Sequence, residues 1–492
     1  MNRRLLLIVT LTASLVPCAP GLWGKNLLDT RVQHQSWFNT PADATLASPA
    51  MAPWRYSSSL SEAGASWQQQ TSKARQGRFD ASSYMWLDST SVVTGSASYH
   101  NGFFHTDGMK ESADLDIVGP YTIADEIGGR MRLEDYAFAG SYSSRRGRRL
   151  AWGVKLGYVA GLSYRHRDPR PRNVTGRLDL SGSVAWLCGS YRLIGEAAWR
   201  KYKQTSEIMF VSEQGVPVVY HFTGLGTSYK RFNGVGYNTH YKGSRYQVGI
   251  GAFPESGVGF FGSVRFSHFG FDYILKDLNR LPMSHLSDNS LSAEIGWRTG
   301  RPTDAFAVSA SFESHAGDGT ENLFGDATTG IYPQIGSIKM YKARRWQSGV
   351  KAVWEHPVVR ATYLSAMVAA DYSHATESYL NPVRSSSLDR LDIDARVRVA
   401  TLAVSSWQLS AQPFANVSRC LDSELLGLDG DTSAPAVDCV NTFERNRRNI
   451  TTFGGTLAAD RSITDAIAVG MSLSAAHNCL GNYFNATLSF IF

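Results

Sequence analysis

The chain has 492 residues, of which 43% are hydrophobic and 18% are charged, with a formal net charge of +7. This balance excludes intrinsic disorder, which requires low hydrophobicity and high net charge. Aromatic residues make up 12% of the chain and cysteines number only 5, which excludes a small disulfide-stapled fold. The basic residues are spread along the sequence, so we expect no nucleic-acid partner.

The N-terminal residues predict an export signal. Two arginines precede an apolar run at Leu5–Val16, and small residues follow it. This run is too short for a membrane-spanning helix, which needs roughly 20 residues. We therefore expect residues 1–24 to be a cleaved signal peptide, and the polar, irregular residues 25–56 to form a periplasmic lead-in.

From residue 57 to residue 492 the sequence keeps one pattern, in which apolar and polar residues alternate. This pattern predicts an all-β domain, a transmembrane antiparallel up-and-down β-barrel over 57–492. We expect about eighteen strands, within a range of fourteen to twenty. The predicted strands are 57–70, 77–88, 91–103, 129–143, 150–164, 173–187, 191–205, 241–252, 258–274, 287–299, 304–316, 340–354, 359–373, 386–403, 405–418, 447–459, 464–476 and 482–492.

The predicted connections alternate between tight turns and long loops. Outer-membrane barrels have short periplasmic turns and longer extracellular loops, whereas a soluble β-sandwich has no reason to sort its loops in this way. Both termini are then expected on the periplasmic side. The long predicted loops are 104–128, 206–240, 317–339 and 419–446.

The loop Arg165–Arg172 reads RHRDPRPR, with four arginines and two prolines. Arginine binds phosphate in a bidentate manner, so this loop is a candidate for gripping lipopolysaccharide phosphates. A stiff, soluble hairpin loop explains the same composition, and both interpretations stay open.

The clearest alternation is in residues 390–399. Apolar residues occupy the odd positions and charged residues the even ones. One face of this strand is therefore expected to contact water. In a barrel of about eighteen strands the interior is wide enough for an aqueous channel unless loops fill it. The sequence therefore predicts a lumen wall of mixed charge, which indicates either charge-selective passage or an internal plug. The lumen-lining candidates are Arg390, Asp392, Asp394, Arg396 and Arg398.

Cys420 and Cys439 bracket an acidic loop, and after export they would meet an oxidising compartment. We expect a disulfide between them, with Cys479 as a competing partner and Cys188 free. A solvated acidic loop is the default interpretation of the carboxylates, because their spacing lacks the pattern of a calcium-binding loop.

Motifs for catalysis are missing from the sequence. There is no G-x-S-x-G and no H-E-x-x-H, and the GVGFFG run at 257–262 lacks the helix that a dinucleotide site requires. We expect no enzymatic activity, no cofactor and no metal. A barrel-embedded lipid hydrolase, assembled from Ser, His and an acid on neighbouring strands, remains an alternative.

The last predicted strand alternates with aromatic residues and ends at Phe490 and Phe492. Here the sequence resembles bacterial outer-membrane β-barrel proteins, and more narrowly an uncharacterised family of such barrels in Bacteroidota. The resemblance implies an outer-membrane location, recognition of the terminal aromatics by the barrel-assembly machinery, and contact with outer-membrane lipid and lipopolysaccharide. A TonB-dependent receptor or another envelope protein is a further implied partner.

The expected function is that of a pore or transport protein for small hydrophilic solutes. An accessory role in TonB-linked nutrient or iron uptake follows from the resemblance alone. The alternative is a structural or assembly component of an outer-membrane complex, which would show an occluded lumen.

Overall fold

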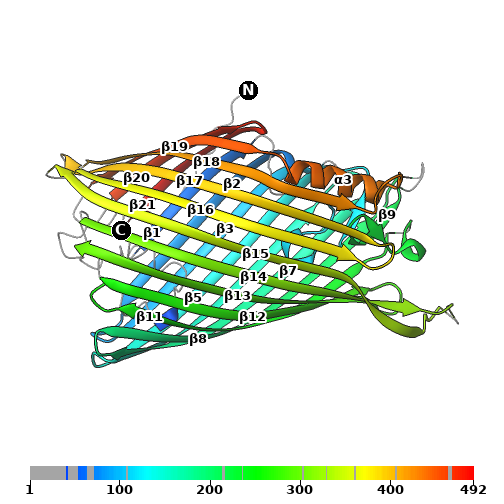
Figure 1. Ribbon diagram of the computed structural model, residues 1–492, viewed down its shortest axis with the longest axis horizontal. Helices are drawn as coiled ribbons and strands as arrows, with labels where there is room; N and C mark the ends of the chain where they lie inside the picture. Colours follow the sequence, from blue (N-terminus) through cyan, green and yellow to red (C-terminus); the bar gives the residue numbers. More distant parts are fainter. Residues whose placement is uncertain are drawn as a thin grey trace.

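A computed structural model of the protein contains one closed β-barrel (Figure 1). Eighteen antiparallel strands form a single sheet, and the last strand, β21, pairs with the first, β1, to close it. The predicted barrel of about eighteen strands is confirmed. The described residues are 40–42, 54–63, 71–106, 109–212, 217–234, 236–301, 304–327, 330–359, 362–404, 407–463 and 468–491.

Outside the barrel wall, the described residues contain three further strands and three helical segments in the loops, and a short helical turn at residues 41–42. The barrel strands are β1 (Trp54–Ala63), β2 (Thr71–Trp86), β3 (Ser91–Thr106), β5 (Gly129–Arg146), β6 (Leu150–Tyr164), β7 (Arg170–Cys188), β8 (Tyr191–Met209), β11 (Thr239–Pro254), β12 (Gly259–Leu275), β13 (Leu281–Arg301), β14 (Asp304–Phe324), β15 (Gln334–Val359), β16 (Thr362–Tyr379), β17 (Arg384–Val404), β18 (Trp407–Leu426), β19 (Ile450–Ser462), β20 (Ala468–Asn478) and β21 (Gly481–Ile491). The loop elements are α2 (Leu115–Val118), β4 (Ile123–Asp125), β9 (Val219–Gly224), β10 (Thr227–Ser228), η3 (Lys230–Phe232) and α3 (Ala434–Asn446).

The two ends of the barrel differ in their connections. At one end, which we call the short-turn end, β7 and β8 are joined through residues 189–190 alone, and Arg55 of β1 pairs with Ile491 of β21. The other end, the long-loop end, carries α3 and the three short strands (Figure 1). The predicted sorting of turns and loops is therefore present in the structure.

Several strands run further than the alternation predicted. The predicted loop 317–339 is mostly strand, because β14 extends to Phe324 and β15 begins at Gln334. Beyond the membrane both faces of a strand meet water or other polar groups, so the apolar-polar alternation fades while the strand pairing continues. The sequence therefore located the membrane-crossing parts of these strands better than their ends.

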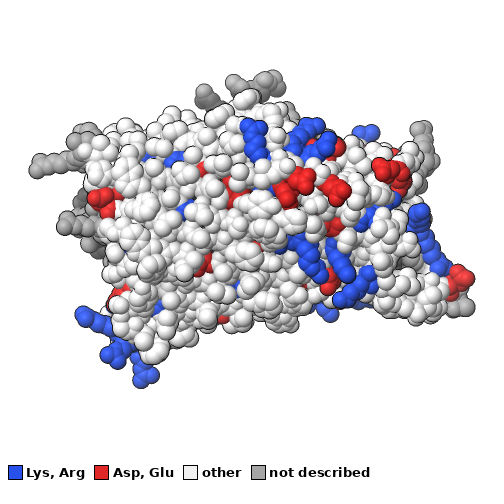
Figure 2. Space-filling view, in the orientation of Figure 1, with Lys and Arg blue, Asp and Glu red and all other residues white. Residues whose placement is uncertain are grey.

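The outer face of the barrel carries an apolar belt. On β6 the outward Val154, Leu156 and Tyr158 are 45%, 54% and 47% exposed. On β15 the exposed Trp346 and Trp354 bound a nine-residue stretch, which matches the roughly 9–11 residues that a membrane-spanning strand needs. Figure 2 shows this largely uncharged middle zone, with the charged side chains gathered towards the ends. No helix in the described part of the chain is long and apolar enough to span a bilayer.

Candidate functional site in the barrel lumen

The first wall of the candidate site is β17, the strand that the sequence singled out. Its apolar residues Ile393, Val397 and Val399 are 39%, 42% and 41% exposed on the outer face. Because successive side chains of a strand point to opposite faces, the alternate residues point into the lumen. The inward row consists of the five predicted candidates, Arg390, Asp392, Asp394, Arg396 and Arg398.

These charges are held by close partners. The Nε atom of Arg396 donates to Asp394 Oδ1 at 2.7 Å, while Arg390 and Asp392 both hydrogen-bond Ser418. Local pairing neutralises much of the charge on this wall, so it offers little net attraction for a solute.

A charged chamber of about 620 Å³ lies along another arc of the inner wall, from β2 to β12. The sequence analysis missed it, although the same alternation carries the signal on each strand: Arg177 and Asp179 flank the outward Leu178 and precede the outward Leu180. The charged lining residues are Arg78, Asp80, Lys155, Arg177, Asp179, Glu196, Arg200, Arg245 and Arg265.

Six cations face three carboxylates in this chamber. Asp179 bridges two arginines, and the other two carboxylates each bind one arginine, at 2.8 Å and 2.6 Å. Arg245 and Lys155 form no ion pair with any described residue, and the Arg245 guanidinium lies 5.3 Å from the centroid of the Phe269 ring. The chamber therefore has an excess of positive charge, which favours an anion inside it.

Two loops at the long-loop end fold into the lumen. The β3–β5 loop supplies α2 and β4, the β8–β11 loop supplies β9, β10 and η3, and the three strands form a small sheet in the order β10-β9-β4. We call the described residues of these loops, 109–128 and 217–234, the plug. Tyr121 of the plug is fully buried and packs in one cluster with the wall residues Tyr241 and Tyr273, which are also fully buried. The plug is thus a packed hydrophobic body inside the barrel.

One buried ion-pair cluster ties the plug to the wall. Arg165, which follows β6, binds Glu111 Oε1 at 2.8 Å and Asp125 Oδ2 at 2.7 Å, and all three side chains are 1% exposed. The Asn173 side chain of β7 donates to the Glu111 carbonyl at 2.6 Å. Because a buried charge is costly without a partner, these groups hold one another in place.

Further hydrogen bonds fix the plug around the wall. Tyr202 of β8 donates to Asp114 at 2.9 Å, and His221 of β9 bonds the Tyr273 hydroxyl at 2.5 Å. On the far side, the NH1 atom of Arg384 in β17 donates to the plug carbonyl of Gly226 at 2.8 Å. The plug is therefore anchored to walls from β7 to β17, not to one strand.

The structure corrects the predicted role of Arg165 in the loop Arg165–Arg172. Arg165 is buried against two plug carboxylates and cannot reach lipid phosphates. Arg170 pairs with Asp168 at 2.7 Å, and the exposed Arg172 pairs with Glu207 at 3.2 Å. Arg165 therefore fastens the plug, a role that neither sequence interpretation included.

The structure also corrects the predicted disulfide. Cys420 and Cys439 are both free thiols, as are Cys188 and Cys479. The helix α3 turns Cys439 inward to pack against the plug cluster, and burial raises the pKa of its thiol to about 12. Cys420 stays on β18, where its thiol contacts the Asp422 carbonyl at 3.5 Å. The sequence interpretation treated this segment as a loop and did not include α3. Because α3 forms, Cys439 lies on a helix that packs against the plug, whereas Cys420 lies on strand β18.

A short N-terminal segment lies inside the lumen at the short-turn end. Thr40 and Ala42 are at most 2% exposed, and the Ala42 amide donates to Ser183 Oγ at 2.8 Å. Apolar Ala42 buries its methyl group there against small inward residues of β6 and β7. Of the predicted lead-in at 25–56, residues 25–39 and 43–53 lie outside the described residues. Residues 1–24 lie outside the described residues.

Gly153 makes room for this segment. A Cβ atom at Gly153 would lie 2.6 Å from the Pro41 carbonyl carbon, whereas one at Gly157, four residues along β6, would meet atoms no closer than 3.8 Å. We expect Gly153→Ala to displace the segment at a cost of about 1–3 kcal/mol, and Gly157→Ala to leave it bound. Limited proteolysis before β1 checks this, and equal cleavage of the two variants would contradict it.

The buried Glu111 gives the plug a pH dependence. Burial, followed by the nearby Asp125 charge, raises the pKa of Glu111 from 4.5 to about 8, although Arg165 opposes the shift. In the packed plug the Glu111 carboxyl group therefore keeps its proton up to about pH 8. In the released loop it loses that proton above its ordinary pKa of 4.5. This contribution to plug stability is complete below pH 4.5 and disappears as the pH rises through 8.

We expect protease cleavage within the plug to increase between about pH 6.5 and pH 9. Burial lowers the pKa of His221 from 6.5 to about 4. His221 becomes protonated in the released loop only below pH 6.5, so it does not affect plug release within this window. Glu111→Gln should remove the pH dependence after correction with an unfolded substrate. A pH dependence that persists in this variant would assign it to another group.

No group of three His, Cys, Asp or Glu side chains is placed to hold a metal ion within the described ranges. Comparison with solved structures finds outer-membrane proteins. An outer membrane transporter, YddB from Escherichia coli, is 7% identical with a TM-score of 0.44, and the match covers 89% of this chain and 81% of that one. The siderophore receptor PiuA from Acinetobacter baumannii is 7% identical with a TM-score of 0.39, covering 89% and 82%. The copper transporter OprC is 8% identical with a TM-score of 0.40, covering 90% and 80%.

Among curated proteins there is no match. One family matches residues 55–492, under the description "Family of unknown function (DUF6850)".

Proposed function

The chain belongs to this family of unknown function, and from the lumen we propose that it is a gated transport protein of a bacterial outer membrane for small hydrophilic solutes, with anions preferred. The observation that carries the proposal is the charged chamber beneath a plug made of the barrel's own loops. A chamber with six cations and three carboxylates is costly to build in a closed barrel, because unpaired charges lose hydration there. A passing anion provides the missing charge.

The proposed location follows from the outer face and the connections. The apolar belt suits contact with lipid, and in outer-membrane barrels the longer loops face the exterior. We place the long-loop end outside and the short-turn end in the periplasm. Phe490 is 38% exposed on the outer face of β21, in keeping with a terminal signal for the barrel-assembly machinery, while Phe492 lies outside the described residues.

An accessory role in TonB-linked uptake is a finer proposal of the same kind. It needs a partner on the periplasmic side that displaces the plug or the segment at 40–42. The membership in Bacteroidota barrels remains a resemblance, and no catalytic step forms part of the proposal.

A second candidate is a structural or assembly component with an occluded lumen. The packing of the plug favours it, since Tyr121, Tyr241 and Tyr273 are fully buried in one cluster. This candidate predicts that the plug never leaves the barrel.

Planar-bilayer recordings of the refolded full chain in a KCl gradient separate the two candidates. Transport predicts gated openings whose reversal potential lies on the chloride side. A barrel that stays ion-tight at every voltage, in the native chain and after plug-loosening substitution of Arg165, would contradict transport and support the structural role.

A further inference from the structure

The outer wall over β8, β11 and β12 combines a basic cluster with an apolar hollow. Lys203 and Lys242 lie directly opposite each other on β8 and β11, and both are well exposed. Like charges that face each other across two strands destabilise a sheet. Neither lysine forms an ion pair with a described residue, so the repulsion is only partly balanced by Asp272, which lies opposite Lys242 on β12.

More cations surround this pair. Lys201 follows on the same face of β8 and donates to Ser244 at 2.9 Å, and the turn between β12 and β13 brings Lys276 and Arg280. Two carboxylates lie nearby, and both are engaged: Asp272 contacts His285 at 2.8 Å, and Glu207 pairs with Arg172 at 3.2 Å and with Lys276 at 3.9 Å. The cluster therefore attracts an anion from outside the protein.

A hollow of about 630 Å³ lies lower on the same strands, towards the short-turn end. Gly182 and Gly195 form its floor, and Val248, Ile250 and Phe266 are among its outward walls. Ile250 is 69% exposed, as expected of a side chain in contact with lipid.

Trp199 and Tyr246, which are paired across β8 and β11, stand between the hollow and the lysines. Such amphipathic rings mark the membrane interface. From Ala197 in the hollow to Lys201 is about 13 Å along the strand at about 3.3 Å per residue. The wall thus has an apolar hollow at the level of the acyl chains, aromatic rings at the membrane interface and cations above them. A membrane lipid with an anionic headgroup has its acyl chains and its charge in the same order.

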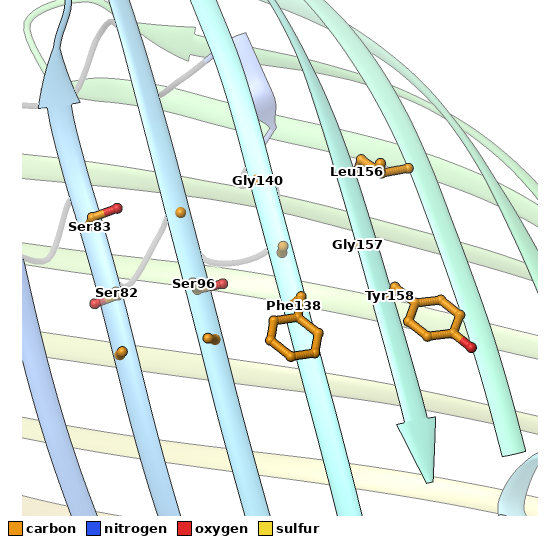
Figure 3. A pocket seen from close by; sticks show the side chains of 12 residues that line it. Ser82, Ser83, Ser96, Phe138, Gly140, Leu156, Gly157 and Tyr158 are labelled. Atoms are coloured by element: carbon orange, nitrogen blue, oxygen red, sulfur yellow. The ribbon is translucent and has the colours of Figure 1, made fainter. Parts of the chain in front are cut away.

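A second outer hollow, of about 490 Å³, is formed by β2, β3, β5 and β6. Figure 3 shows Phe138, Leu156 and Tyr158 beside it, with Gly140 on its floor. It has no comparable pair of facing lysines above it, because the outward Arg130 and Arg132 of β5 lie opposite His105 and Phe103 of β3. This hollow serves as a matched control.

We propose that the wall over β8, β11 and β12 is a binding site for a phosphorylated lipid of the outer leaflet, with its phosphate on Lys201, Lys203 and Lys242 and an acyl chain in the hollow over Gly195. The site is independent of transport through the lumen, because all of these side chains face outward.

The test is native mass spectrometry of the full chain in detergent with diphosphoryl lipid A as the probe. We expect one tightly retained lipid per barrel. The double variant Lys203→Gln/Lys242→Gln should weaken retention about tenfold, while Arg132→Gln/Lys342→Gln, which removes two cations from other outer walls, should change it less than twofold. Inorganic phosphate at equal concentration should not compete.

The hollow is tested separately. A Cβ at Gly195 meets nothing within 4 Å, and one at Gly140 meets only the Thr94 carbonyl oxygen at 3.8 Å, so both positions accept a larger side chain. Gly195→Leu should weaken retention of lipid A, and Gly140→Leu should not. Equal effects of the two double variants, or no effect of Gly195→Leu, would overturn the proposed site. Heat-modifiable migration on gels confirms that each variant is folded.

Discussion

Replacing Arg165 with alanine is expected to release the plug. The substitution leaves Asp125 at 1% exposure without its cation and Glu111 without its hydrogen-bond donor, and breaking a buried ion pair in this way costs about 3–5 kcal/mol. The barrel strands keep their own pairing, so the loss should be confined to the plug. We expect rapid proteolysis within residues 109–128 and steady ion conductance in planar bilayers.

Arg172→Ala is the matched control for this prediction. Arg172 lies on the same side of the barrel but is exposed, with a single ion pair to Glu207 at 3.2 Å, and such pairs are worth at most about 1 kcal/mol. Its proteolysis pattern and conductance should match those of the native chain. If Arg165→Ala behaved like this control, the buried cluster would not be what holds the plug.

Replacing Arg245 with glutamate in the released-plug background is expected to reduce anion selectivity. Arg245 lines the chamber without an ion-pair partner among the described residues, so its charge acts on solutes more fully than that of Arg396, which is paired with Asp394 at 2.7 Å. The charge change of two units should lower the chloride-to-potassium permeability ratio about fivefold, or about 1 kcal/mol.

Reversal potentials in a KCl gradient measure this ratio directly. Arg396→Glu/Arg398→Glu should move selectivity towards cations as well, since both residues face the lumen. Arg130→Glu, on the outer face of β5, should leave the ratio unchanged. If all three variants gave the released-plug value, the conduction path would not pass these walls.

Alternation along single strands was enough to predict the barrel. In residues 390–399 it separated an outward apolar face from the inward charged row, and the structure keeps that separation. The same rule applies to β7 and β8, where each charged residue looks unremarkable alone. The chamber forms because several strands place such residues at the same height along the barrel axis. That placement depends on the register between strands, which cannot be read from a single sequence.

The plug was beyond sequence reasoning for a related reason. Arg165 is separated from Glu111 by 54 positions and from Asp125 by 40, so a loop rich in arginine and proline appeared to be exposed. Likewise, Cys420 and Cys439 were predicted to form a disulfide because the sequence interpretation did not include helix α3, which carries Cys439. Long polar loops carry no periodic pattern that would reveal inward folding.

Hydrogen exchange of the full chain in lipid nanodiscs would show whether the loops occupy the lumen. Amides of β9, the middle strand of the small sheet, should exchange as slowly as those of the barrel strands, since they are paired and buried. Exchange of residues 219–224 as fast as that of the exposed turn at 380–383 would mean that the loops extend into solvent and that the lumen has no plug.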